Sequence, residues 1–271
     1  MAHRHSHHGG GILMLDTLAA RSGLRFVSPG LKTGFCVLVL LLCVGASDAV
    51  VGIFVALSMV LFMGLLGKTP LRQLAQLLRI PLLFLCVSCL VILLEVVREP
   101  MGVWQMRLGS VWVCITGQSL HRAVTLFFQA MGAVCCLYAL SSTTPMPQLI
   151  EVLRSFHVPD LVIELMYLIY RYLFVLLEVH RQLTVAATAR LGYVGFRRSI
   201  STAGRVSGTL LASSFRRSRA CFDAMESRGY DGKLAFLSHT PRLRWAHLLA
   251  SAAYVLTLMG LIFVRKGWLH L

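Results

Sequence analysis

Five long apolar runs constrain this chain more than any other feature of its sequence. They lie at about 33–47, 49–66, 80–97, 119–140 and 245–264. A helix needs about 20 apolar residues to cross a hydrocarbon core that is roughly 30 Å thick. Charged residues make up only 14% of the 271 residues, whereas a soluble domain carries about 25%. The sequence therefore predicts an integral membrane protein rather than a soluble bundle of helices.

Positive charge is concentrated late in the chain. Residues 181–244 contain twelve Lys and Arg but only three acidic residues, within a chain of net charge +15. Basic residues next to membrane spans mark the cytoplasmic side, and Lys68, Arg72 and Arg79 follow the second apolar run in the same way. A basic patch can also bind nucleic acid, but spans flank this one. We expect both basic segments to lie at the cytoplasmic face, with membrane lipid as a partner and no nucleic acid.

Residues 160–180 are apolar enough for a span, yet topology argues against one. If the N-terminus and the first basic segment are inside, four spans return the chain to the cytoplasm near residue 141. A further crossing would put the most basic segment outside. Glu164, Arg171 and Glu178 are seven residues apart and share one helix face, which a lipid-exposed helix rarely carries. We therefore expect a long helix that packs on protein at the cytoplasmic face.

The cytoplasmic segment is expected to be helical. Its predicted helices lie over about 147–157, 160–192 and 200–229. The last of these contains small residues, among them Gly204, Ser207 and Gly208, which let another helix cross at close range. Alternating side chains around Gly109 predict an external β-hairpin over 103–117. The fold class is therefore an all-α integral membrane protein with about five transmembrane helices and a cytoplasmic coupling region of two long crossing helices.

These elements divide the chain into four predicted parts, with the N-terminus inside and the C-terminus outside. They are a His/Gly-rich tail (1–11), an N-terminal transmembrane domain (12–140), a cytoplasmic coupling domain (141–241) and a final transmembrane helix (242–271). The tail contains His3, His5, His7 and His8. These histidines could bind a divalent metal loosely, or the segment could be a purification tag or an inert tail.

One phrase occurs twice in the basic region, as "TARLGYVG" (188–195) and "MESRGYDG" (225–232). Both copies share a small residue, Arg, an optional Leu, and then Gly-Tyr-x-Gly. A helix C-cap explains an Arg followed by Gly, but it does not explain the repeated Tyr-x-Gly. Small neighbours leave the guanidinium of Arg190 or Arg228 free to enter a groove on a partner, where its planar fork suits carbonyls or a carboxylate. Two such arginines predict two similar sockets, as a dimer of cytoplasmic ATPases would offer.

The chain shows no sign of being an enzyme. "GLLGKT" (64–69) ends like a phosphate-binding loop, but Phe62 stands where that pattern requires its first Gly. No arrangement of acids, His or Ser typical of catalysis stands out. Cys86 and Cys89 lie in an apolar run and are best interpreted as core residues. We therefore expect a non-catalytic protein that binds no cofactor itself and, apart from the histidines of the tail, no metal.

The two phrases, together with "SSTTPMPQLIEVLRSFHVP" and "LIYRYLFVLLEV", resemble the transmembrane T component of energy-coupling-factor (ECF) transporters. The cobalt/nickel branch, CbiQ-like, is the most similar, and the likeness covers about residues 14–265. It implies a bacterial cytoplasmic membrane protein that assembles with two ABC-type ATPase subunits, a substrate-binding membrane S component and, in some systems, a small accessory membrane subunit. ATP is then bound by the ATPases and the transported metal by the S component.

The resemblance also implies roles for particular residues. Ala189, Arg190 and Leu191 would dock on one ATPase, and Ser227, Arg228 and Gly229 on the other. The first copy departs from the family pattern, because Leu191 stands in the Gly place and Gly192 follows one residue later.

A rival interpretation is a self-contained channel or secondary transporter. It predicts ionisable groups inside the spans, for which Glu95, near a span end, is thin support. The residues do not distinguish cobalt, nickel or a vitamin as the substrate.

Overall fold

The computed structural model describes residues 19, 22–23, 27–65, 67, 70–93, 95–97, 104–108, 111–232 and 245–269. These residues fall into two compact units. One, called the membrane unit here, holds the described residues up to 149 together with the last helix. The other, called the coupling unit, holds described residues 150–232. The coupling unit begins at Ile150, whereas the boundary expected from the sequence is at 141; residues up to Thr143 belong to a long helix of the membrane unit.

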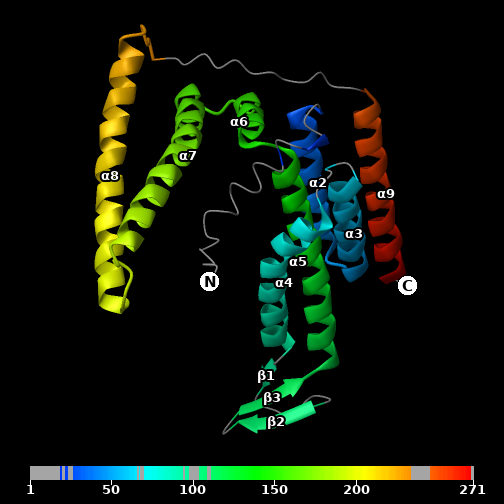
Figure 1. Cartoon of the computed structure of the whole chain (residues 1–271). Coiled ribbons are helices and arrows are strands. Elements are labelled where there is room, and N and C mark those ends of the chain that lie inside the picture. Colours follow the sequence, from blue (N-terminus) through cyan, green and yellow to red (C-terminus); the bar gives the residue numbers. More distant parts are fainter. Residues whose placement is uncertain are drawn as a thin grey trace. The chain divides into compact units, whose positions relative to one another are not determined.

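The membrane unit contains five long apolar helices (Figure 1). They are α2 (Pro29–Ala46), α3 (Ala49–Leu65), α4 (Leu71–Leu93), α5 (Gly117–Thr143) and α9 (Trp245–Leu269). Four of the described helices are long and apolar enough to cross a membrane, and α3 is a shorter apolar helix of 17 residues. The predicted all-α membrane fold is therefore confirmed, and the chain is a multi-pass membrane protein.

Local sequence signals fix the ends of these helices. Pro29 occupies the first turn of α2, where the missing N–H of proline does no harm. The helix ends at Ser47, whose φ of 51° is left-handed, and Asp48 then accepts a hydrogen bond from the backbone N–H of Val50 at 3.0 Å. At the start of α5, Thr116 and Ser119 form a reciprocal capping box.

The predicted hairpin is confirmed, and it is part of a small sheet. Strands β2 (Trp104–Leu108) and β3 (Val111–Ile115) pair antiparallel, and β1 (Glu95–Val97) pairs with the other edge of β3. The turn at Gly109 lies outside the described residues. The predicted end of the third span at residue 97 was wrong. The β-branched residues Val96 and Val97 belong to a strand instead of the helix.

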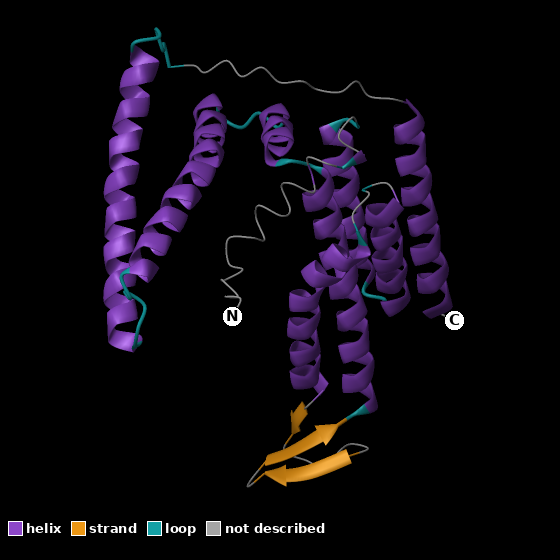
Figure 2. Ribbon diagram, in the orientation of Figure 1, coloured by secondary structure: helices purple, strands orange, loops and turns teal. Residues whose placement is uncertain are grey.

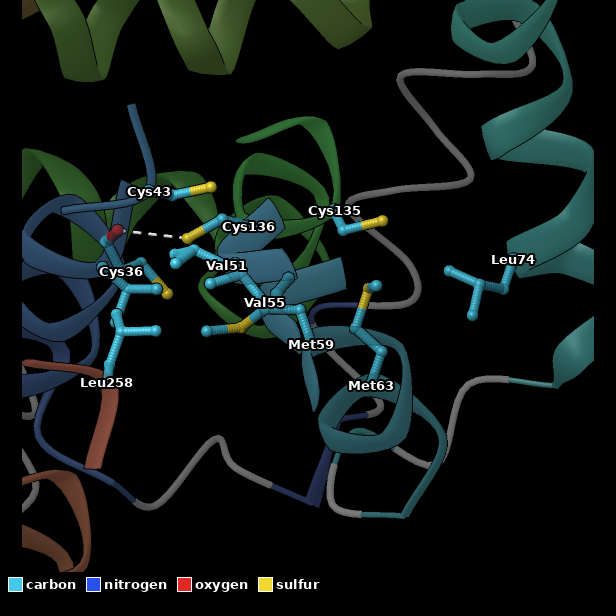
Figure 3. Packing of buried hydrophobic residues seen from close by; sticks show 12 residues of the cluster. Cys36, Cys43, Val51, Val55, Met59, Met63, Leu74, Cys135, Cys136 and Leu258 are labelled. Carbon is cyan, nitrogen blue, oxygen red and sulfur yellow. Dashed lines mark hydrogen bonds between the residues drawn. The ribbon is translucent and has the colours of Figure 1, made fainter. Parts of the chain in front are cut away.

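Side chains from α2, α3 and α5 form the core of the membrane unit (Figure 3). Val39, Val51 and Val55 are fully buried, and so are the thiols of Cys43 and Cys135. The Cys136 thiol donates to the carbonyl oxygen of Cys36 at 3.1 Å, which links α5 to α2. These cysteines therefore serve as small packing residues.

Two glycines allow a close contact between α3 and α5 in the membrane unit. A Cβ atom added to Gly52 of α3 would lie 2.5 Å from the backbone of Phe128 in α5. One added to Gly132 of α5 would lie 2.9 Å from the carbonyl oxygen of Gly52. Small residues at a helix interface let two backbones approach in this way. The sequence arguments had not identified this crossing.

The coupling unit is built on two long antiparallel helices (Figure 1). After α6 (Met146–Ser155), the chain forms α7 (Asp160–Ala189) and α8 (Phe196–Glu226). All three helices agree with the predicted ranges to within a few residues. The helix α7 is not among the described helices that qualify as membrane spans, in agreement with the argument from its charges.

Candidate docking site

The first copy of the repeated phrase forms the turn between α7 and α8. Arg190 ends α7, and Leu191 takes a left-handed φ of 58°. The N–H of Leu191 donates to the carbonyl of Thr188 at 3.0 Å, and the N–H of Gly192 donates to the carbonyl of Ala187 at 2.9 Å. This pair of hydrogen bonds defines a Schellman motif.

The second copy repeats the same backbone geometry at the other end of α8. Gly229 has a φ of 78°. Its N–H donates to Glu226 at 3.0 Å, and the N–H of Tyr230 donates to Met225 at 3.1 Å. Both phrases therefore end a helix with one Schellman motif, in which the residue after the Arg is left-handed.

The common backbone defines which residues of the two copies correspond. Leu191 is equivalent to Gly229, so Leu191 is no insertion. Gly192 is then equivalent to Tyr230, and the two tyrosines occupy different positions. Gly192 is required for packing, because a Cβ there would lie 2.9 Å from the Ala187 carbonyl and 3.0 Å from Thr202 of α8.

The last glycine of each phrase has a conformational reason. Gly195, directly before α8, has a φ of 83°, and Gly232 has a φ of 89°. Side chains strongly disfavour such values, so glycine stands there in both copies. Helix capping did not explain the Tyr-x-Gly of the repeated phrase. Backbone geometry explains the final glycine of that part.

Figure 2 shows the helical hairpin formed by α7 and α8. The two motif arginines are exposed, and because one follows the end of α7 and the other the end of α8, they lie at opposite ends of this hairpin. Ala189, Leu191, Ser227 and Gly229 beside them are exposed as well. Since α8 has 31 residues, it separates the two arginines by about 46 Å at 1.5 Å per residue. The length of α8 therefore determines the spacing of any two sockets that bind both arginines.

Each motif arginine lines a groove with two further arginines. Arg190 shares a groove of about 500 Å³ with Arg198 and Arg205 of α8. At the far end of the hairpin, Arg228 shares a groove of about 590 Å³ with Arg171 of α7 and Arg217 of α8. No carboxylate is among the described residues that line either groove. Both ends of the hairpin are therefore suited to an acidic partner.

The four additional arginines were not recognised as site residues from sequence. Arg198 and Arg205 are seven residues apart, which puts them on one face of α8. That spacing could have indicated from sequence that Arg198 and Arg205 belong to one site. Arg171 was noted only as part of a charged stripe, because its proximity to Arg228 depends on how α7 packs against α8.

Tyr230 ties the second motif to the start of α7. Its hydroxyl donates to the carboxylate of Glu164 at 3.0 Å, and Glu164 is only 6% exposed. This hydrogen bond raises the pKa of Tyr230, because the protonated phenol is the donor. A hydrogen bond to Cys221 of α8 likewise raises the pKa of Tyr172 in α7. These contacts hold the groove around Arg228 together.

The residues expected at the crossing of the two long helices do not contact α7. Gly204, Ser207 and Gly208 are exposed, and no atom lies within 4 Å of a Cβ placed on either glycine. The antiparallel turn directs the opposite face of α8 towards α7, with Thr202 and buried Val206 at the contact. The prediction that these three residues form that crossing was therefore wrong.

The sequence left open whether the histidines of the N-terminal tail bind a metal. His3, His5, His7 and His8 lie outside the described residues. Within the part of the chain that the structure describes, no three His, Cys, Asp or Glu residues gather as metal ligands.

Comparison with known proteins adds a second line of evidence. A family model described as "Cobalt transport protein" matches residues 21–240. The putative fused cobalt transport protein CbiMQ of Methanocorpusculum labreanum is 29% identical over 92% of this chain, which spans only 42% of that relative's length. The cobalt transport protein CbiQ of Rhodobacter capsulatus is 30% identical over 70% of this chain and 72% of its own length. The CbiQ of Salmonella typhimurium is 29% identical over 56% of this chain and 68% of its own length.

The family match covers most of the membrane unit and all of the α7–α8 hairpin with its two arginine motifs. The chain therefore belongs to the CbiQ family of cobalt transport proteins.

Proposed function

We propose that this chain is the non-catalytic coupling subunit of an ATP-driven metal importer of the ECF type. In this role two ATPase subunits, which bind the ATP, dock on the α7–α8 hairpin. The chain then transmits their movement to a separate substrate-binding membrane subunit. Cobalt is the favoured cargo, because the related proteins of Rhodobacter capsulatus and Salmonella typhimurium are named for cobalt transport. Nickel is the chemically similar alternative.

One observation carries the proposal, namely that the two ends of the hairpin are built alike. Each end exposes an arginine on a Schellman motif, and each arginine lies in a groove with two more arginines and no lining carboxylate. Matching ends suit a partner that offers the same acidic socket twice, such as a dimer of identical or related ATPases.

The exposed small residues of α8 are suited to a second partner. Gly204, Ser207 and Gly208 lie on a face that also exposes Leu211 and Phe215, which are 59% and 64% exposed. A stripe of small residues between large apolar ones suits close contact with another apolar helix. We assign this face to the substrate-binding membrane subunit.

The rival function is a self-contained channel or secondary transporter. Among the described residues, the structure does place a buried basic residue in a span, because Lys32 of α2 is only 4% exposed. Its ammonium donates to the carbonyl oxygen of Thr143 and to Oε1 of Gln148, so a structural role accounts for it. Metal flux into vesicles that contain this chain without ATPases would establish the rival.

Single substitutions of the two arginines test the docking proposal. Arg190→Ala and Arg228→Ala should each reduce retention of ATPase subunits on the tagged chain at least tenfold, equivalent to about 1.4 kcal/mol. Uptake of radioactive cobalt should fall in parallel. Arg219→Ala is the matched control, because Arg219 is an exposed arginine of α8 outside both motifs. ATPase retention and uptake at control levels in both motif variants would refute docking through these residues.

A further inference from the structure

The two docking ends share a backbone motif, but a different side-chain contact holds each of them. At the α7–α8 turn, Oγ1 of Thr202 donates to the carbonyl oxygen of Gly192 at 2.7 Å, within ten residues of the chain. At the far end, the hydroxyl of Tyr230 donates to Oε2 of Glu164 at 3.0 Å, across 66 residues. The first contact is therefore local, whereas the second joins the turn after α8 to the start of α7.

The groove at this far end contains charges that repel one another. Arg171, Arg217 and Arg228 line it, and no carboxylate is among the described residues of the lining. Like charges repel each other more strongly the closer they lie. Arg228 follows the end of α8, where the regular backbone hydrogen bonding of the helix ends and local opening is easiest. Repulsion within the groove therefore acts most on the turn that carries Arg228.

Glu164 is placed to hold this turn on the correct face of α7. It lies seven residues before Arg171, so the two share one helix face, and Leu168 between them lines the groove. Glu164 is only 6% exposed, and a buried carboxylate requires hydrogen-bond donors. A hydrogen bond that a carboxylate accepts is also stronger than one between neutral groups. The bond from Tyr230 therefore fixes the turn against the face of α7 that carries Arg171.

We propose that Tyr230 is a positioning residue for docking, because its hydrogen bond to Glu164 holds the turn of Arg228 against α7 before an ATPase binds. This role rests on the proposed function, in which Arg228 enters a socket on an ATPase subunit. A turn that is already ordered loses less conformational freedom on docking, so the complex is tighter. Tyr193 of the first copy is exposed and occupies a different position of the motif, so we expect no such role for it.

Removal of one hydroxyl group tests this role. Tyr230→Phe keeps the ring but not the donor, and it should reduce retention of ATPase subunits on the tagged full chain about fivefold. Tyr193→Phe is the matched control and should leave retention unchanged. Glu164→Gln should keep most of the retention, because the amide oxygen still accepts from the phenol. In the chain without ATPases, the amides of Gly229 and Tyr230 should exchange hydrogen faster in Tyr230→Phe.

Double variants show whether Tyr230 acts through Arg228. Tyr230→Phe should cause no further loss of retention in an Arg228→Ala background, but about the same fivefold loss in an Arg190→Ala background. General weakening of the hairpin would instead cause equal losses in both backgrounds, and that result would overturn the positioning role. If Arg228→Ala reduces retention and Tyr230→Phe does not, docking stands and only the positioning role is refuted. Full retention in Arg228→Ala would refute docking at this end and the role of Tyr230 with it.

Discussion

At the scale of single residues, the left-handed positions after the two arginines are the most informative. Leu191 and Gly229 adopt similar positive φ values on equivalent Schellman motifs, but only glycine does so without strain. For an L-residue such as leucine this conformation costs about 1–2 kcal/mol. Leu191 is also 64% exposed, so burial of its side chain does not offset that strain. The turn after Arg190 is therefore strained, whereas the turn after Arg228 is not.

Two glycines of the same region should respond in opposite directions to alanine. Gly229→Ala should destabilise the hairpin end by about 1 kcal/mol, because its φ is positive. Gly204→Ala should stabilise α8 by about 0.5–1 kcal/mol, since the position is helical and nothing crowds a Cβ there. Hydrogen exchange of the α8 amides in detergent measures both effects. Changes of the same sign would contradict this account.

At the scale of elements, α9 is fastened to the rest of the membrane unit by a few specific contacts. Arg265 near its end forms two hydrogen bonds with Asp48 in the α2–α3 turn, at 2.8 and 3.2 Å. Tyr254 bonds to Ser58 and stacks edge-on against Phe35, with ring centroids 5.4 Å apart. The Asp48–Arg265 pair is thus a polar attachment at that end of α9.

The attachment of α9 should loosen in acid. The Arg265 guanidinium holds the pKa of Asp48 below its usual range. Stabilisation by the pair is therefore fully present above the unfolded pKa of about 3.9 and is lost as the pH falls through the lower folded value. Asp48→Asn should loosen α9 at neutral pH and remove this acid step, as judged by hydrogen exchange of the α9 amides. Asp223→Asn, at an exposed position of α8, should do neither.

At the scale of the whole molecule, the number of spans determines on which side each end lies. Five apolar helices put the two ends of the membrane unit on opposite sides, provided that the 17-residue α3 crosses as well. Arg265 at the predicted outer end seemed to oppose this topology. Arg265 pairs there with Asp48, in the turn at the same end.

An accessibility experiment tests the topology. An epitope at the C-terminus should be accessible from outside in spheroplasts, whereas one inserted after Val194, in the α7–α8 turn, should be accessible only after permeabilisation. The physical reason is that basic segments are retained on the cytoplasmic side. Detection of both epitopes from the same side would mean that one apolar helix, most simply α3, does not cross.

Much of the fold could be predicted because its signals are local. Span length, the alternation around Gly109 and the charged stripe of 160–180 each depend on neighbouring residues, and the structure has the corresponding helices and hairpin. The repeated phrase likewise located both helix ends. Predictions failed where a residue's role depends on a distant partner, as for Gly204 and Gly208, whose small size gave no indication of which face α8 turns towards α7.

The sequence by itself determined that this chain crosses a membrane several times. It also determined two long polar-faced helices, each of which ends in an arginine motif. These features could be predicted because hydrophobic length, charge asymmetry and capping act over a few residues. Only the tertiary structure decided that Gly52 and Gly132 form the close crossing and that Lys32 lines a cavity. It also decided which four arginines line grooves with the motif arginines, namely Arg171, Arg198, Arg205 and Arg217. Those contacts join residues far apart in sequence, so they follow from the packing of whole helices.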